Sequence, residues 1–150
     1  DSWRIIENMN EIFFYENLLI NTIQSLIGVF ISIALIQSSI DKIIDRKGNF
    51  EWLTDHFIDT ILNNHVSLLL FIVTITELLS GLLLFFGAFI NILFSNFDLL
   101  ILGYCLSAIN FIFLFLGQRI AKDYAGAAVI VNYFILNILG LISILFSFFK

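Results

Sequence analysis

Residues 66–94 have the sequence VSLLLFIVTITELLSGLLLFFGAFINILF, and this stretch decides the fold class because it is long, continuous and almost entirely apolar. A bilayer's hydrocarbon core needs about 20 apolar residues to cross it as a helix, so this run is long enough. One ionisable residue, Glu77, lies near its middle, roughly 15 Å from its start at the α-helical rise. A carboxylate facing lipid at that depth would be costly, so we expect Glu77 to be protonated, paired, or turned toward protein or water.

The whole chain has the composition of an integral membrane protein. Of its 150 residues, 60% are hydrophobic and 13% are charged, and none is proline. Soluble domains have roughly 45–50% apolar and 25% charged residues. We therefore expect a single membrane domain over residues 1–150. The net charge of -5 comes without a basic patch, which excludes nucleic acid as a partner.

Polar turns divide the apolar sequence into four predicted membrane spans. These spans cover about residues 18–40, 66–94, 99–116 and 124–149. The one long connection, residues 41–65, carries aromatic and aliphatic residues at helical spacing among polar ones. We therefore predict an all-α fold, an integral membrane four-helix bundle with an amphipathic interfacial helix between spans one and two.

The segment before the first span is amphipathic. Its apolar side consists of Ile5, Ile6, Met9, Ile12 and Phe13. This pattern fits either a short helix lying at the membrane surface or a helical lead-in to the first span. The acidic start, without a basic segment before a short apolar core, is not typical of a signal peptide.

Basic residues predict the orientation of the spans. One side of the membrane would hold Lys42, Arg46, Lys47, Arg119 and Lys122, and the other Arg4 and Lys150. The excess of basic residues on cytoplasmic loops places residues 41–65 in the cytoplasm and both termini outside.

A family resemblance is carried by the end of span one and by span two. The sequence SSIDK at 38–42 precedes the aromatic-bearing loop, and residues 77–87 read ELLSGLLLFFG. Over roughly residues 20–145 the chain resembles the DoxX family of small four-span bacterial membrane proteins. The resemblance implies the bacterial cytoplasmic (inner) membrane and a link to respiratory or thiol-linked redox systems. The name-giving members resemble a small subunit of a quinone-reactive oxidoreductase.

Glu77 is the main candidate for an intramembrane functional residue. It could accept protons or contact a quinone, because a buried acid can exchange a proton at membrane depth. Alternatively, it is protonated, hydrogen-bonds to Asn110, Asn132 or a serine, and fixes the register of the bundle.

Three basic residues are candidates for contact with lipid head groups or a partner protein. Lys42 lies at the predicted cytoplasmic end of span one, and Arg119 and Lys122 lie in the turn between spans three and four. The simpler alternative is that all three anchor the spans at the membrane surface.

Several kinds of site are not predicted. His56 and His65 lie in the long loop without a recognised set of further ligands, so no metal site is expected. The predicted spans contain neither histidine nor methionine to ligate a haem within the bundle. We find no motif of a self-contained enzyme and predict no catalytic residue.

Two functional hypotheses remain. The chain is either an accessory subunit of a respiratory or redox membrane complex, packed against larger membrane-protein partners, or an autonomous protein that binds a quinone or lipid around Glu77 in a proton-linked pocket. The first hypothesis expects copurification with larger partners, and the second expects a ligand retained by the isolated protein.

Overall fold

The computed structural model describes residues 2–149, and within them every regular element is helical, as predicted. The elements in chain order are α1 (Ser2–Ile44), α2 (Arg46–His56), the 3-10 helix η1 (Asn63–His65), α3 (Val66–Phe94), α4 (Asp98–Ile120) and α5 (Tyr124–Leu145). Asp1 and Lys150 lie outside the described residues, so the placement of Lys150 in the orientation argument stays a prediction.

Four of these helices, α1, α3, α4 and α5, are long and apolar enough to cross a membrane. The shortest, α5, has 22 residues. At the α-helical rise this is a length of about 33 Å, slightly more than the hydrocarbon core of a bilayer. The prediction of a multi-pass, all-helical membrane protein is confirmed at this level.

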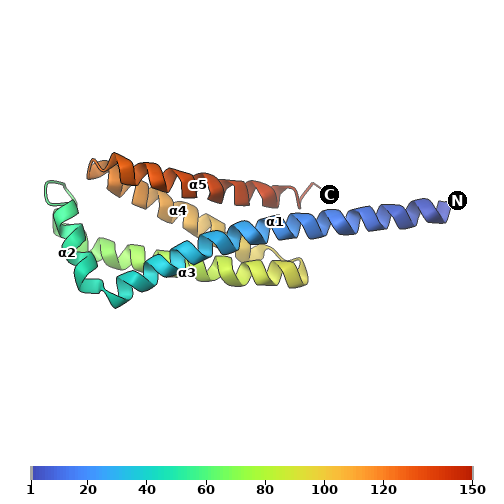
Figure 1. Cartoon of the computed structure of the whole chain (residues 1–150), viewed down its shortest axis with the longest axis horizontal. Helices are drawn as coiled ribbons and strands as arrows, with labels where there is room; N and C mark the ends of the chain where they lie inside the picture. The colour runs from blue at the N-terminus through green and yellow to red at the C-terminus, as the bar shows by residue number, and fades with distance from the viewer. Residues whose placement is uncertain (1, 150) are drawn as a thin grey trace.

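The four long helices form a bundle in which each packs mainly against two neighbours, with a smaller contact between α1 and α4. The packed pairs are α1 with α3, α3 with α4, α4 with α5, and α5 with α1. Figure 1 shows α2 at one end of this bundle, near the turn that joins α4 to α5. The N- and C-terminal ends of the described chain point the other way, so the basic residues of α2 and of the α4–α5 turn share one end.

The helix in the connection between α1 and α3 is shorter than the apolar spacing of residues 41–65 suggests. Asp45 caps α2 by accepting a hydrogen bond from the Gly48 amide, and α2 ends at His56. Beyond it, the Thr60 hydroxyl donates to the Phe57 carbonyl and accepts from the Leu62 amide, local bonds that compete with helix continuation. No residue of α2 is buried, and its amphipathic role at the membrane surface stays a prediction.

Helix α1 continues without a break from the N-terminal segment into the first span. Its 43 residues correspond to a length of about 64 Å, roughly twice the hydrocarbon core. Figure 1 shows its N-terminal part projecting beyond the other helices. The structure therefore shows the helical lead-in rather than a separate surface helix.

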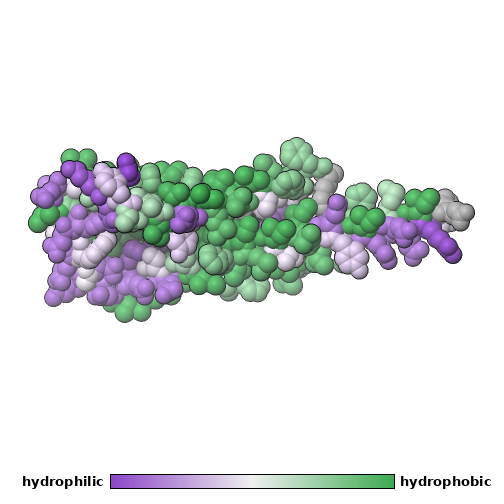
Figure 2. Space-filling model, turned by 45° about the horizontal axis from the view of Figure 1, so that its top comes forward, coloured by the Kyte–Doolittle hydropathy of each residue, from purple (hydrophilic) through white to green (hydrophobic). Residues whose placement is uncertain are grey.

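Small residues let the helices approach closely in the bundle. Gly87 on α3 lies so near α4 that an added Cβ would come 2.7 Å from the Leu100 backbone nitrogen. Gly103 on α4 faces α3 in the same way, because its Cβ would lie 2.8 Å from the Leu84 backbone nitrogen. Such contacts are typical of membrane helices, where van der Waals packing drives association. Outward-facing Leu, Ile and Phe side chains cover the bundle, and Figure 2 shows them as a belt of hydrophobic surface between the hydrophilic α2 end and the projecting part of α1.

We expect Gly87→Ala to destabilise the bundle, because α4 backbone atoms occupy the space that the methyl group needs. Overpacking of this kind costs about 1–3 kcal/mol. Gly117→Ala is the matched control, since its Cβ would meet only Phe57 Cζ at 3.5 Å, and both variants gain the same helix propensity. Thermal unfolding in detergent, followed by circular dichroism, measures the difference. Equal melting temperatures would contradict the close α3–α4 contact.

Candidate functional site

A buried ion pair explains how the chain accommodates Glu77. The Lys42 ammonium lies 2.9 Å from Oε2 of Glu77 and 3.3 Å from Oε1. Only 3% of the Glu77 side chain and 18% of the Lys42 side chain are exposed. Ser38 completes the site, because its hydroxyl donates to Glu77 Oε1 at 3.2 Å and accepts from Lys42 at 2.6 Å. The carboxylate thus meets a cation and a hydroxyl rather than lipid.

Helix geometry brings these three side chains together. Ser38 and Lys42 are four residues apart on α1 and therefore lie on the same face. That face packs against α3, which carries Glu77. Since Lys42 is in the last turn of α1, the pair belongs to the α2 end of the bundle.

A cavity of about 600 Å³ opens beside the ion pair. One part of its lining is polar and aromatic, with Ser38, Lys42, Asn49, Trp52, His56, Glu77 and Gln118. The other part is aliphatic and aromatic and includes Leu69, Leu70, Val73, Phe113, Leu114, Leu116 and Ile130. Its volume lies in the usual range for small-molecule sites, which is roughly 300–1,000 Å³.

The aromatic side of the cavity is held in place by a contact between α2 and α4. The His56 ring nitrogen Nε2 lies 2.7 Å from Gln118 Oε1. Trp52 stacks on His56, with ring centroids 4.6 Å apart and planes 18° from parallel. Trp52 and His56 are one helical turn apart on α2, and this spacing was the sequence signal for their stacking. Nothing in the sequence indicated that Gln118 is the partner of His56.

The two predicted supporting residues lie elsewhere. The Asn110 side chain accepts a hydrogen bond from the Thr76 hydroxyl at 2.8 Å, and its amide nitrogen is buried without a partner among the described residues. Asn132 is exposed on α5. The structure thus joins Glu77 to Ser38 and Lys42, and not to either asparagine.

Arg119 and Lys122 lie at the surface near the start of α5. The Arg119 guanidinium is 4.6 Å from the centre of the Tyr124 ring, a cation–π contact. Lys122 is exposed in the α4–α5 turn with φ of 61°, in the left-handed region. Neither lines the cavity, so their predicted contact with head groups or a partner remains separate from Glu77.

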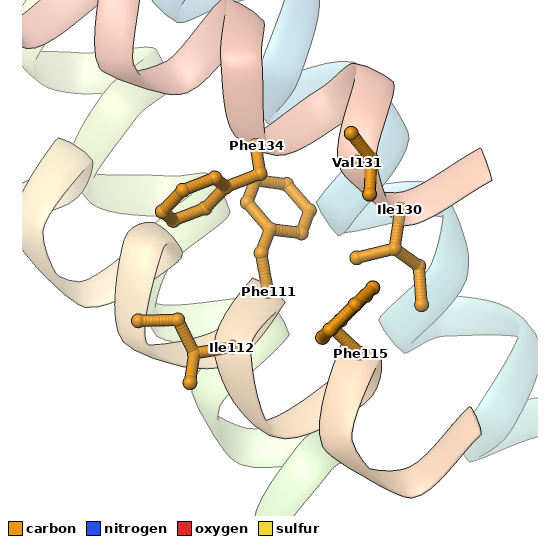
Figure 3. A pocket seen from close by; sticks show the side chains of 6 residues that line it. All are labelled: Phe111, Ile112, Phe115, Ile130, Val131 and Phe134. Carbon is orange, nitrogen blue, oxygen red and sulfur yellow. The ribbon is translucent and has the colours of Figure 1, made fainter. Parts of the chain in front are cut away.

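A second, smaller hollow lies on the outer side of α4 and α5. Its volume is about 190 Å³, and all its lining residues are apolar. Figure 3 shows Phe111, Ile112 and Phe115 on α4, and Ile130, Val131 and Phe134 on α5. We call this hollow the α4–α5 groove.

An uncharged polar network links the helices toward the other end of the bundle. The Asn91 amide donates to Gln24 Oε1 at 3.0 Å, and the Tyr104 hydroxyl donates to the Gln24 carbonyl at 2.7 Å. Ser107 and Asn137 connect α4 with α5. These buried bonds join four helices, as polar side chains do in membrane bundles, and we assign them a structural role.

The cavity can hold a molecule with a polar head and an apolar body. Lys42 and Gln118 supply hydrogen-bond donors, while Glu77 and Gln118 supply acceptors. Within residues 2–149, no group of three or more His, Cys, Asp or Glu side chains is placed to hold a metal ion.

No protein-family model, no curated protein and no solved structure matches this chain.

We expect the Lys42–Glu77 pair to show strong energetic coupling. Removing one partner leaves a charge in an apolar site, whereas removing both does not. In a double-mutant cycle of Lys42→Met and Glu77→Gln, the coupling free energy should be about 2 kcal/mol, measured by unfolding in mixed detergent micelles.

The exposed pair Lys47–Glu51 provides the control for this cycle. Its N–O distance is 3.8 Å, and 89% and 63% of its side chains are exposed, so water screens the interaction. The same cycle there should show no measurable coupling. Additive effects at Lys42 and Glu77 would contradict the buried ion pair.

Proposed function

We propose that this chain is a membrane protein that binds an amphipathic small molecule, a quinone or a lipid, with its polar head against Lys42 and Glu77. The observation that carries the proposal is the cavity of about 600 Å³ in which a buried ion pair faces an apolar wall. Ligand sites typically combine mostly apolar linings with a few placed polar groups.

The ion pair is suited to orient a polar head group. The Lys42 ammonium has three hydrogens, and it contacts Ser38 Oγ at 2.6 Å, the Ser38 carbonyl at 3.4 Å and the Glu77 carboxylate at 2.9 Å. The longest of these contacts, to the Ser38 carbonyl, can be exchanged for a carbonyl oxygen of the ligand. Among the described residues that line the cavity, Glu77 is the only one with a carboxylate, so it is placed to accept a hydrogen bond from a ligand hydroxyl.

Trp52 provides a direct test, because it lines the cavity and the only other tryptophan is Trp3. In a Trp3→Phe background, a benzoquinone with a ten-carbon chain should quench Trp52 fluorescence saturably. Glu77→Gln should weaken binding about tenfold, equivalent to about 1.4 kcal/mol. Asp98→Asn is the matched control, since Asp98 is exposed at the start of α4, and it should bind as the parent does.

Two results would contradict the binding proposal. One is quenching that rises linearly with quinone and never saturates. The other is an equal affinity in the parent and in Glu77→Gln, both verified as folded. Displacement of the quinone by a neutral lipid would identify the lipid as the ligand class.

The projecting part of α1 favours a second candidate, an accessory subunit of a respiratory or redox complex in a bacterial inner membrane, as the DoxX resemblance implies. Large apolar side chains there are exposed, among them Trp3, Ile5 and Phe13. An exposed apolar stripe on a helix that extends past its own bundle is suited to dock on a larger membrane partner.

Under this second candidate, Ile6→Asp combined with Phe13→Asp should release the protein from a large complex. The reason is that both side chains lie on the apolar side of the projecting helix. A native gel of mild-detergent extracts from native membranes, with bands identified by mass spectrometry, measures the release. Asn8→Asp, on the opposite side, should leave migration unchanged. If the unaltered protein migrates on the native gel as a small species, the subunit proposal is overturned.

A further inference from the structure

The cavity and the α4–α5 groove meet at one residue. Ile130 lines both of them, and it comes from the second turn of α5. Figure 3 shows Ile130 lying opposite Phe115 across the groove. Ile130 is therefore the side chain that divides the cavity from the groove, and a ligand that reached from the ion pair into the groove would pass along it.

The α4–α5 groove is suited to bind a hydrocarbon chain. Its lining is wholly apolar, and its volume is about 190 Å³. Apolar cavities of about 150 Å³ stay dry and bind benzene, so the groove admits a segment of about six carbons. Ile112 and Val131 are 54% and 38% exposed, which opens the groove to the lipid surrounding α4 and α5.

The cavity disfavours an anionic head group. Lys42 is the only lysine or arginine in its lining, and Glu77 already neutralises it. A phosphate or carboxylate would meet the Glu77 charge in an apolar site without a free cation. A neutral head, which offers carbonyl or hydroxyl oxygens, meets no such opposition.

We infer that the ligand is a neutral amphiphile with one hydrocarbon chain, which runs past Ile130 and lies in the α4–α5 groove. The inference rests on the proposed function and adds to it the class of ligand and its route. The ligand enters and leaves sideways from the bilayer between α4 and α5, while its head contacts Lys42 and Glu77.

The test compares two benzoquinones, one with a ten-carbon chain and one with a methyl group, by Trp52 quenching in the Trp3→Phe background. The long chain should bind about tenfold more tightly in the parent, because it buries further methylenes. In Ile112→Phe and Val131→Phe, which alter residues that line the groove and not the cavity, this advantage should fall below threefold, while the affinity of the methyl compound stays unchanged. Leu139→Phe, on the exposed side of α5, is the control and should retain the full advantage.

The possible outcomes test the proposed binding function and the route of the hydrocarbon chain separately. Saturable binding of both quinones with no effect of chain length overturns the tail route but leaves the proposed function standing. No saturable binding of either quinone overturns both. Equal losses in Leu139→Phe would show a general membrane effect and overturn the route as well.

A second measurement covers the case in which the groove variants fail to fold. A ten-carbon quinone with a photoreactive group at the chain end, applied to the parent protein, should label residues 111–115 and 130–134. Labelling concentrated on α1 or spread over all exposed helix faces would overturn the route. Competition by a ten-carbon monoacylglycerol distinguishes the sources: displacement assigns the site to any neutral single-chain lipid, and its absence assigns it to quinones.

Discussion

The ion pair between Lys42 and Glu77 is the contact on which the α2 end of the molecule depends. It joins the last turn of α1 to α3 through a distance of 2.9 Å, and Ser38 bonds to both partners. In an apolar medium such a pair is stable only if both charges are present and hydrogen-bonded. The register between α1 and α3 is therefore tied to this end, because a shift by one turn would separate the two charges.

The other end of the bundle is held together without charge. Gln24, Asn91 and Tyr104 are fully buried, and Asn91 and Tyr104 each donate a hydrogen bond to Gln24. Gly87 and Gly103 allow direct contact between α3 and α4. The two ends thus use different physical means, and among the described residues the ion pair is the one that lies beside the cavity of about 600 Å³.

The sequence revealed the class of fold because run length and hydropathy are local properties. The four spans and the all-helical architecture follow from them. Apolarity does not report helix length, however, so the sequence left open whether the segment before span 18–40 is a helical lead-in or a separate surface helix, and the structure shows one helix from Ser2 to Ile44. The partner of Glu77 depends on helix rotation and register, which separate Asn132 on the exposed side of α5 from Asn110 in the interior. The cavity involves residues of five helices, and no local pattern records it. The DoxX resemblance rests on short apolar motifs and stays a prediction.

The contents of the cavity decide how strong the ion pair is. Water beside Lys42 and Glu77 would screen their attraction, whereas pure hydrocarbon would offer the ammonium no acceptor beyond Ser38 and Glu77. Under the proposed function an amphipathic molecule would resolve this conflict, because its polar head would bond to the ammonium while its body excluded water from the apolar wall. Occupancy and the strength of the pair are then linked, so a ligand that binds here also stabilises the contact between α1 and α3.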